Sequence, residues 1–203
     1  MKPKDDVDTN LSIKSLEKYW KKKSELIFWH KKPKRILTDN LFYNDGKVNI
    51  AYNCIESNIK KGLGNKIAVY LIDKNEKQTF LTYKEISNLV DHFISFLKKN
   101  YSKSDLYSNI ISIHSSANLC SLISMLALMK LGITHCVFFN DLSHDAIKIR
   151  LKLLNSKIII SSASNEDFKK KILNIKNVKK IKFSDEIFRN KNVKSLNFIN
   201  FYK

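Results

Sequence analysis

Few residues in this chain are of a type and spacing that could carry chemistry, and the clearest are two serines. Ser115 and Ser116 come directly after residues 110–113, which predict a buried strand. In doubly wound sheets, small molecules often bind where such strands end. No general base is identifiable for the two serines, so we assign neither a nucleophile nor any other catalytic residue.

Metal and phosphate motifs are not found in the sequence. His135 and Cys136 are adjacent, but no second ligand pair stands at metal-site spacing, so we expect an ordinary strand pair and no metal. Gly62-Leu-Gly64 precedes a predicted strand, whereas a dinucleotide loop follows one, which favours a tight turn. No G-x-x-x-x-G-K-[ST] motif is present, and no glycine follows Gly132.

Apolar runs and helical periodicity alternate from residue 66 onward. Strands are predicted at 67–72, 80–81, 110–113, 133–139, 158–160 and 178–183. Helices are predicted from a Thr82/Glu85 capping box to about residue 99, over 118–130, and from a Ser143 cap to residue 154. Gly132 is expected to close the second of these helices. Leu126 and Met129 are expected to be buried in it, between two parallel strands.

Continuous apolar strands that alternate with helices predict the fold class. We expect an α/β fold, a doubly wound and mostly parallel sheet with helices on both faces, after an irregular helical N-terminal region. In that region Ser15 is expected to cap a helix that carries Leu16 and Trp20, and Pro33 to end the helix that holds Phe28 and Trp29.

The net charge of +18 comes from 37 basic and 19 acidic residues, and only three of the basic residues are Arg. Lys, Asn and Ile are all abundant, which is typical of genome-wide compositional drift. A protein that binds nucleic acid phosphates specifically would be expected to contain more Arg, which can form bidentate contacts. We therefore expect no specific nucleic acid partner. The first ten residues are polar and do not resemble a signal peptide. The most apolar stretch, residues 117–131, is interrupted by polar residues and is too short for a transmembrane helix, so no membrane association is expected. Three cysteines without motif spacing favour a reducing compartment, and we predict a cytoplasmic protein.

Several segments resemble, in order, one family. Residues 41–54, LFYNDGKVNIAYNC, resemble W-F-x-G-G-x-L-N-x-x-Y-N-C; residues 81–85, LTYKE, resemble L-T-Y-x-E-L; residues 125–139, MLALMKLGITHCVFF, resemble M-L-A-C-A-R-I-G-A-I-H-S-V-V-F. Trp20 with residues 28–29, the Ser143/Ala146/Arg150 spacing and the SAS at 162–164 add to the pattern. Together they resemble the N-terminal portion of the short-chain acyl-CoA synthetases, the AMP-forming acetyl- and propionyl-CoA synthetases of the adenylate-forming superfamily.

This resemblance implies a function that the chain would carry only in part. The family activates a small carboxylate with ATP and Mg²⁺ to an acyl-adenylate, from which CoA displaces AMP. The phosphate loop, the adenine and acyl pockets and the C-terminal domain with its catalytic Lys lie beyond the resembling part, so the α/β domain is incomplete and no cofactor is expected to bind this chain alone. Lys169, Lys170 and Lys171 are the candidates for contact with the CoA phosphate, in place of the Arg residues of the family. Residues 115–120, SSANLC, replace a Met-Pro…Pro-Glu stretch of the family.

The resulting prediction divides the chain into an N-terminal docking region (1–65), a truncated AMP-binding-type α/β domain (66–183) and a Lys/Asn-rich tail (184–203). The expected function is that of an N-terminal fragment or split subunit of an acetyl- or propionyl-CoA synthetase, inactive alone, with the missing remainder as a separate partner chain. Two alternatives are open from the sequence: a complementing or regulatory subunit, and a basic nucleic-acid-binding protein.

Overall fold

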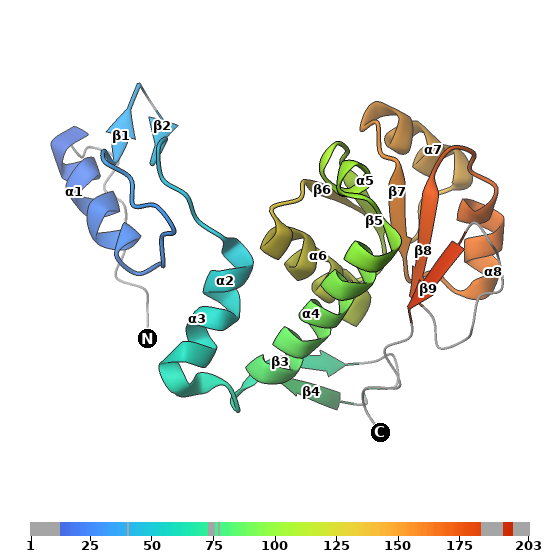
Figure 1. Cartoon of the computed structure of the whole chain (residues 1–203), viewed down its shortest axis with the longest axis horizontal. Coiled ribbons are helices and arrows are strands. Elements are labelled where there is room, and N and C mark those ends of the chain that lie inside the picture. Colours follow the sequence, from blue (N-terminus) through green and yellow to red (C-terminus); the bar gives the residue numbers. More distant parts are fainter. Residues whose placement is uncertain (1–12, 40, 73–75, 77, 184–192, 197–203) are drawn as a thin grey trace. The chain divides into compact units, whose positions relative to one another are not determined.

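The computed structural model describes residues 13–39, 41–72, 76, 78–183 and 193–196 (Figure 1). The helices are α1 (Ile13–Ser24), α2 (Ile50–Cys54), α3 (Glu56–Asn58), α4 (Tyr83–Asn100), α5 (Lys103–Tyr107), α6 (Leu119–Leu131), α7 (His144–Leu153) and α8 (Asn165–Phe168), with π-helical turns η1 (Ile59–Leu63) and η2 (Lys169–Leu173). The strands are β1 (Leu37–Thr38), β2 (Leu41–Phe42), β3 (Ile67–Ile72), β4 (Gln78–Thr82), β5 (Ile111–His114), β6 (His135–Phe138), β7 (Ile158–Ser161), β8 (Lys179–Phe183) and β9 (Val193–Leu196).

Aromatic packing organises the first compact unit, which ends at Asn49. The rings of Trp20 and Phe42 lie 5.7 Å apart, and the Tyr43 hydroxyl donates to the Trp20 carbonyl at 2.7 Å. Gly46 is required beside Trp29, because a Cβ there would lie 2.6 Å from the indole ring. Trp20 thus ties α1 to β2 and to the turn that follows β2.

Two expectations for this unit are wrong. Ser15 lies inside α1, which already includes Ile13, so Ser15 does not cap that helix. Phe28 and Trp29 lie in irregular chain, because α1 ends at Ser24 rather than close to the proline. The Trp29 indole N–H donates to the Ser24 carbonyl at 2.8 Å, and this contact satisfies a helix-end acceptor that a longer helix would have used internally.

The second compact unit begins at Ile50 rather than after residue 65, where the sequence suggested a boundary. The short helix α2 packs against α6, and Ala51 and Ile55 belong to the main core. The segment between residues 50 and 65 therefore folds with the α/β unit. Most of the expected tail, residues 184–203, lies outside the described residues.

The strands β3 and β4 form a separate antiparallel pair and do not join the parallel sheet (Figure 1). The inner face of this pair packs on the core through Val69, Leu71 and Leu81. The chain then enters α4 through the predicted capping box. Glu85 N donates to Thr82 Oγ1 at 3.3 Å, and Thr82 N donates to Glu85 Oε2 at 2.7 Å.

The parallel sheet confirms the predicted fold class. Its order is β6-β5-β7-β8-β9, and every neighbouring pair is parallel. The predicted closing glycine is also found: Gly132 has φ +70° and ends α6, where the absence of a Cβ avoids strain. The predicted cap of α7 is confirmed by the bond from Ala146 N to Ser143 Oγ at 3.2 Å.

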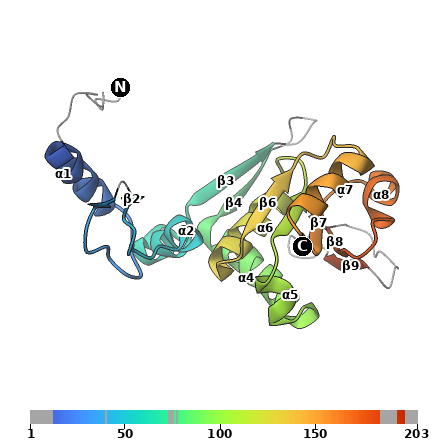
Figure 2. The ribbon, with the colours of Figure 1, turned by 90° about the horizontal axis from the view of Figure 1, so that it is seen from above.

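Two cores lie on opposite faces of this sheet. One face packs on α4 and α6, and Ile158, Ile160 and Ile181 contribute to it. The other packs on α7, α8 and η2, and includes Ile159 and the fully buried Phe168. Figure 2 shows α7 and α8 gathered on the same side of the strands. Alternation along each strand sends successive side chains into different cores.

Within the residues described, no helix combines the length and apolar character needed to cross a bilayer.

Substituting Leu126 tests the main core. Leu126 is 9% exposed in the cluster that α4 and α6 share, whereas Met129, also expected to be buried, is only half-buried. We expect Leu126→Ala to lower the free energy of unfolding by about 2–5 kcal/mol, from lost burial and a residual cavity. Urea denaturation measures this. Leu153→Ala is the matched control: Leu153 is 80% exposed, and its loss should stay within about 0.5 kcal/mol. Equal effects of the two substitutions would contradict the packing described.

Candidate functional site

The carboxyl edge of β5 and β7 lies where the winding of the sheet reverses. The chain leaves β5 through α6 on one face, adds β6, and returns through α7 on the other face to place β7 on the opposite side of β5. Small molecules bind preferentially in the crevice outside the strand ends at such a reversal. The predicted serines lie here, so their expected place at a strand end is confirmed.

Three polar side chains meet at this edge. Ser115 follows β5 and Ser162 follows β7, and their hydroxyl oxygens are 2.6 Å apart. The Asn118 amide donates to Ser162 Oγ at 2.9 Å and its oxygen accepts from Ser115 at 3.0 Å. The same oxygen accepts from Ser121 N at 3.1 Å, which caps α6. Ser116 is exposed beside the cluster.

No group in this cluster is arranged to activate a nucleophile. The hydrogen bonds described for Ser115 lead to other hydroxyl, amide and carbonyl groups, none of which is a base at neutral pH. Cys120 lies close by, and burial raises the pKa of its thiol to about 12, so the thiol stays protonated and unreactive. The cluster can hold and orient a ligand, but its own residues offer no bond-making step.

His114 points to the other face of the sheet. It is fully buried, its Nδ1 lies 3.1 Å from Ser161 Oγ, and its Nε2 has no hydrogen-bond partner among the described residues. Burial, followed by the charge of Lys171, lowers the pKa of this imidazole. The backbone of Asn140 acts in the opposite direction, but the two lowering causes outweigh it. His114 is therefore neutral at pH 7.

The predicted CoA-phosphate candidates lie in η2, beside this edge. Lys169 and Lys170 are exposed. Lys171 is half-buried and is held by Asp167 Oδ1 and the Asn140 carbonyl, each at 3.3 Å. The three lysines are thus not equivalent: two extend into solvent, and the third already has a carboxylate partner.

Sequence reasoning did not single out Lys182, which brings a charge to the same edge. Lys182 is 3% exposed at the end of β8, and its ammonium donates to the Ala163 carbonyl at 2.5 Å and lies 5.5 Å from the centre of the Phe168 ring. The alternation of Lys180 and Lys182 with Ile181 and Phe183 was the available signal. Lysine at two consecutive inward positions of an otherwise apolar strand is unusual, because burial of an ammonium is costly.

No group of three or more metal-ligating side chains is found in the described part of the chain.

A family model described as "Acetyl-coenzyme A synthetase N-terminus" matches residues 8–54. Among curated relatives, acetyl-coenzyme A synthetase of Cupriavidus metallidurans is 27% identical over 158 residues, which are 74% of this chain and 23% of that protein. The enzyme of the same name from Magnetococcus marinus is 28% identical over 176 residues, 82% of this chain and 27% of that protein. The chain thus spans about a quarter of the length of these relatives.

The fold has a counterpart among solved structures. Acetoacetyl-CoA synthetase from Streptomyces lividans superposes with a TM-score of 0.76 over 91% of this chain and 31% of that chain, at 11% sequence identity. At that identity the likeness concerns the fold alone.

Titration of His114 gives a test of this edge. Its pKa is 6.5 when unfolded and lower when folded, so the unfolded chain takes up the proton first as pH falls. The stability that the neutral, buried ring contributes is complete above pH 6.5 and is lost as pH falls below it. We expect the urea midpoint to decline from pH 7 to pH 5, and His114→Gln to flatten this decline. A slope that persists in the folded variant would contradict the assignment.

The family model and the sequence relatives agree with one another, and the chain is accordingly similar to the N-terminal region of the acetyl-CoA synthetases, with a fold that the structural neighbour shares.

Proposed function

We propose that this chain supplies the N-terminal part of an acetyl- or propionyl-CoA synthetase and acts together with the polypeptide that corresponds to the rest of that enzyme. The complete assembly would convert a carboxylate, ATP and CoA into acyl-CoA, AMP and pyrophosphate. The similarity to synthetases over most of the chain supports this role. ATP, Mg²⁺ and CoA would be bound by the complete assembly and not retained by this chain alone.

An uncovered apolar surface carries the proposal most directly. On the outer face of the β3–β4 pair, Tyr70 and Phe80 are direct cross-strand partners and are 62% and 58% exposed. Ile72 beside them is 66% exposed. The inner face of the same pair is also apolar, and strands that are apolar on both faces are typical of sheets covered on both sides. We infer that further polypeptide of the synthetase covers this hairpin face.

A second apolar surface adjoins the edge strand β6. Phe139 and Leu153 are 77% and 80% exposed, and they line a cavity of about 300 Å³ together with Val137 and Arg150. In the described sheet β6 pairs only with β5, so its other edge keeps unpaired backbone groups. An apolar groove beside such an edge is suited to an incoming strand or helix.

The first prediction from this proposal concerns activity. The chain alone is expected to give no ATP–pyrophosphate exchange with acetate or propionate, because its sequence has no phosphate loop and its serine edge has no base. Mixed with the remaining three quarters of a matching synthetase, such as that of Cupriavidus metallidurans, it should give exchange above either component alone. Exchange by the chain alone at the level of the mixture would contradict the proposal.

A substitution on the hairpin face tests the inferred contact, and a substitution elsewhere on the α/β unit is its control. Phe80→Ser should abolish the restored exchange, because it places a small polar side chain in the inferred interface. Ile149→Ser removes a similarly exposed apolar side chain, 59% against 58%, from α7, which packs on the other face of the sheet, and should leave the exchange unchanged. Equal loss in both variants would show that the hairpin face is not the contact.

The alternative of a regulatory subunit uses the same surfaces and differs in one outcome. If the partner polypeptide is active alone and the chain only changes its rate, the chain regulates; if neither component is active alone, the chain completes the enzyme. A cytoplasmic location stays a prediction from the sequence.

Net charge is the observation that favours the nucleic-acid alternative, and salt dependence tests it. We expect the chain to bind a labelled duplex or single strand weakly and without preference. That binding should fall steeply between 50 and 200 mM salt, since lysine neutralises phosphate through counterion release. Filter binding or fluorescence anisotropy measures this. Tight binding at physiological salt with a preference for one sequence or structure would favour a nucleic-acid protein instead.

A further inference from the structure

A lysine-lined cavity lies at the amino edge of the sheet, at the opposite ends of the strands from the serine cluster. We name it the α7 cavity; it has a volume of about 530 Å³. Its lining comes from one face of α7, from the turn before β7 and from the turn before β8: His144, Lys148, Leu151, Lys152, Asn155, Ser156, Lys157, Asn174, Ile175, Lys176, Asn177 and Val178.

Charge is the distinguishing property of this cavity. Four lysines line it and no aspartate or glutamate does. The lysines come from three separate segments: Lys148 and Lys152 from α7, Lys157 from the turn before β7, and Lys176 from the turn before β8. Among the described residues, none of the four takes part in an ion pair. A concave surface with charges of one sign concentrates its field and attracts the opposite ion.

A buried ammonium stands directly behind this cavity. Lys180 is 5% exposed, and its Nζ donates to the carbonyls of Ile175 and Val178, both of which line the cavity, at 2.8 Å each. Those partners are neutral, so the charge of Lys180 has no carboxylate close to it among the described ion pairs. An anion in the α7 cavity would offset both the four lining charges and this buried one.

The volume and the lining of the cavity indicate which class of anion would fit it. Its volume falls in the range typical of small-molecule sites, and lysine ammonium groups bind phosphate as point charges. No aromatic side chain lines it, so it offers no platform on which nucleic acid bases could stack. We propose that the α7 cavity binds the phosphate chain of a small polyphosphate, either inorganic or carried by a nucleoside.

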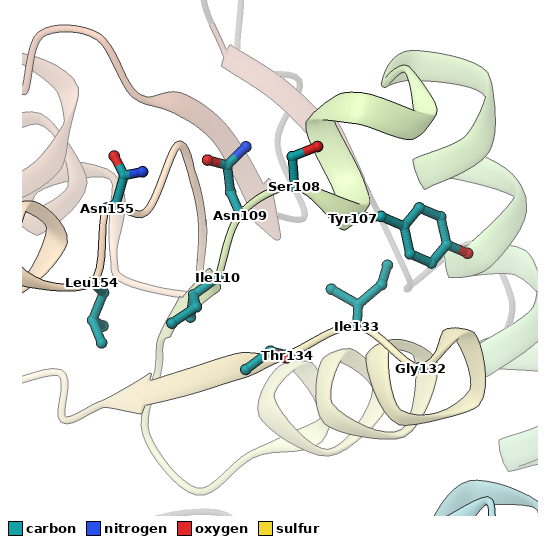
Figure 3. A pocket seen from close by; sticks show the side chains of 9 residues that line it. All are labelled: Tyr107, Ser108, Asn109, Ile110, Gly132, Ile133, Thr134, Leu154 and Asn155. Atoms are coloured by element: carbon teal, nitrogen blue, oxygen red, sulfur yellow. The ribbon is translucent and has the colours of Figure 1, made fainter.

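A neighbouring cavity offers a way to distinguish inorganic polyphosphate from a polyphosphate carried by a nucleoside. Asn155 lines both the α7 cavity and a second one of about 280 Å³ (Figure 3). The nine residues of this second cavity include no acidic residue, lysine, arginine or histidine; they mix amide and hydroxyl groups such as Asn109 and Thr134 with apolar side chains such as Ile133. A neutral sugar or base would suit it, whereas a free polyphosphate would leave it empty.

Calorimetric titration with inorganic tripolyphosphate, at fixed ionic strength and without divalent metal, tests the site. We expect saturable binding of one tripolyphosphate per chain. Lys148→Gln combined with Lys152→Gln should weaken it at least about tenfold, since each removed ammonium takes a charged hydrogen bond from the ligand. Lys98→Gln with Lys99→Gln is the matched control, because these exposed lysines of α4 lie outside the cavity and their loss lowers the net charge equally. The control should stay within about twofold of the unmodified chain.

The same titration with a nucleoside triphosphate distinguishes the two sources. Tighter binding than tripolyphosphate, lost on the same double substitution, supports a nucleoside-borne phosphate chain; equal binding supports the phosphate chain alone. Absence of saturable binding, or equal weakening by both double substitutions, would overturn the proposal. So would loss on Lys169→Gln with Lys170→Gln only, which would place the ligand at the carboxyl edge. None of these outcomes depends on synthetase activity.

Discussion

The pairing of β5 with β7 is the constraint on which the rest of the α/β unit depends. These strands are far apart in sequence, yet three hydrogen-bonded pairs of polar side chains join them and the residues beside them: Ser112 with Ser156 at 2.9 Å, His114 with Ser161 at 3.1 Å and Ser115 with Ser162 at 2.6 Å. Buried polar groups must find hydrogen-bond partners, and a shift of one residue would separate all three pairs. These three pairs therefore fix the register of β5 against β7. That register places α6 and α7 on opposite faces, the serine cluster at one edge and the α7 cavity at the other.

Much of this architecture follows from local sequence signals. The capping box at Thr82 and Glu85, the closing Gly132 and the continuous apolar strands each act over a few residues, and each was predictable. The pairing of strands that are distant in sequence could not be predicted in the same way. The apolar run 67–72 has the same appearance as a central strand, yet it pairs with β4 in its own hairpin, because pairing partners depend on tertiary contacts that no short pattern encodes.

The candidate site shows the same division between local and distant information. The position of Ser115 after a strand was readable from the sequence, but its partner Ser162 lies 47 residues away and is brought to it only by the strand order. From the sequence alone, the lysines of the α7 cavity could only be interpreted as part of the general positive surface charge. Only the fold shows that three separate segments bring them together around one cavity, in front of the buried Lys180.

Similarity to synthetases of which this chain covers only about a quarter, and an apolar hairpin face that is exposed in the described part of the chain, together suggest a chain that works as part of a larger assembly. Hydrogen–deuterium exchange, measured for the chain alone and mixed with the remaining part of a matching synthetase, tests this claim most directly. The account predicts that amides of Ile67–Ile72, Gln78–Thr82 and His135–Phe138 exchange more slowly in the mixture, while those of α5 are unchanged. Unchanged exchange throughout the hairpin and the edge strand would contradict it.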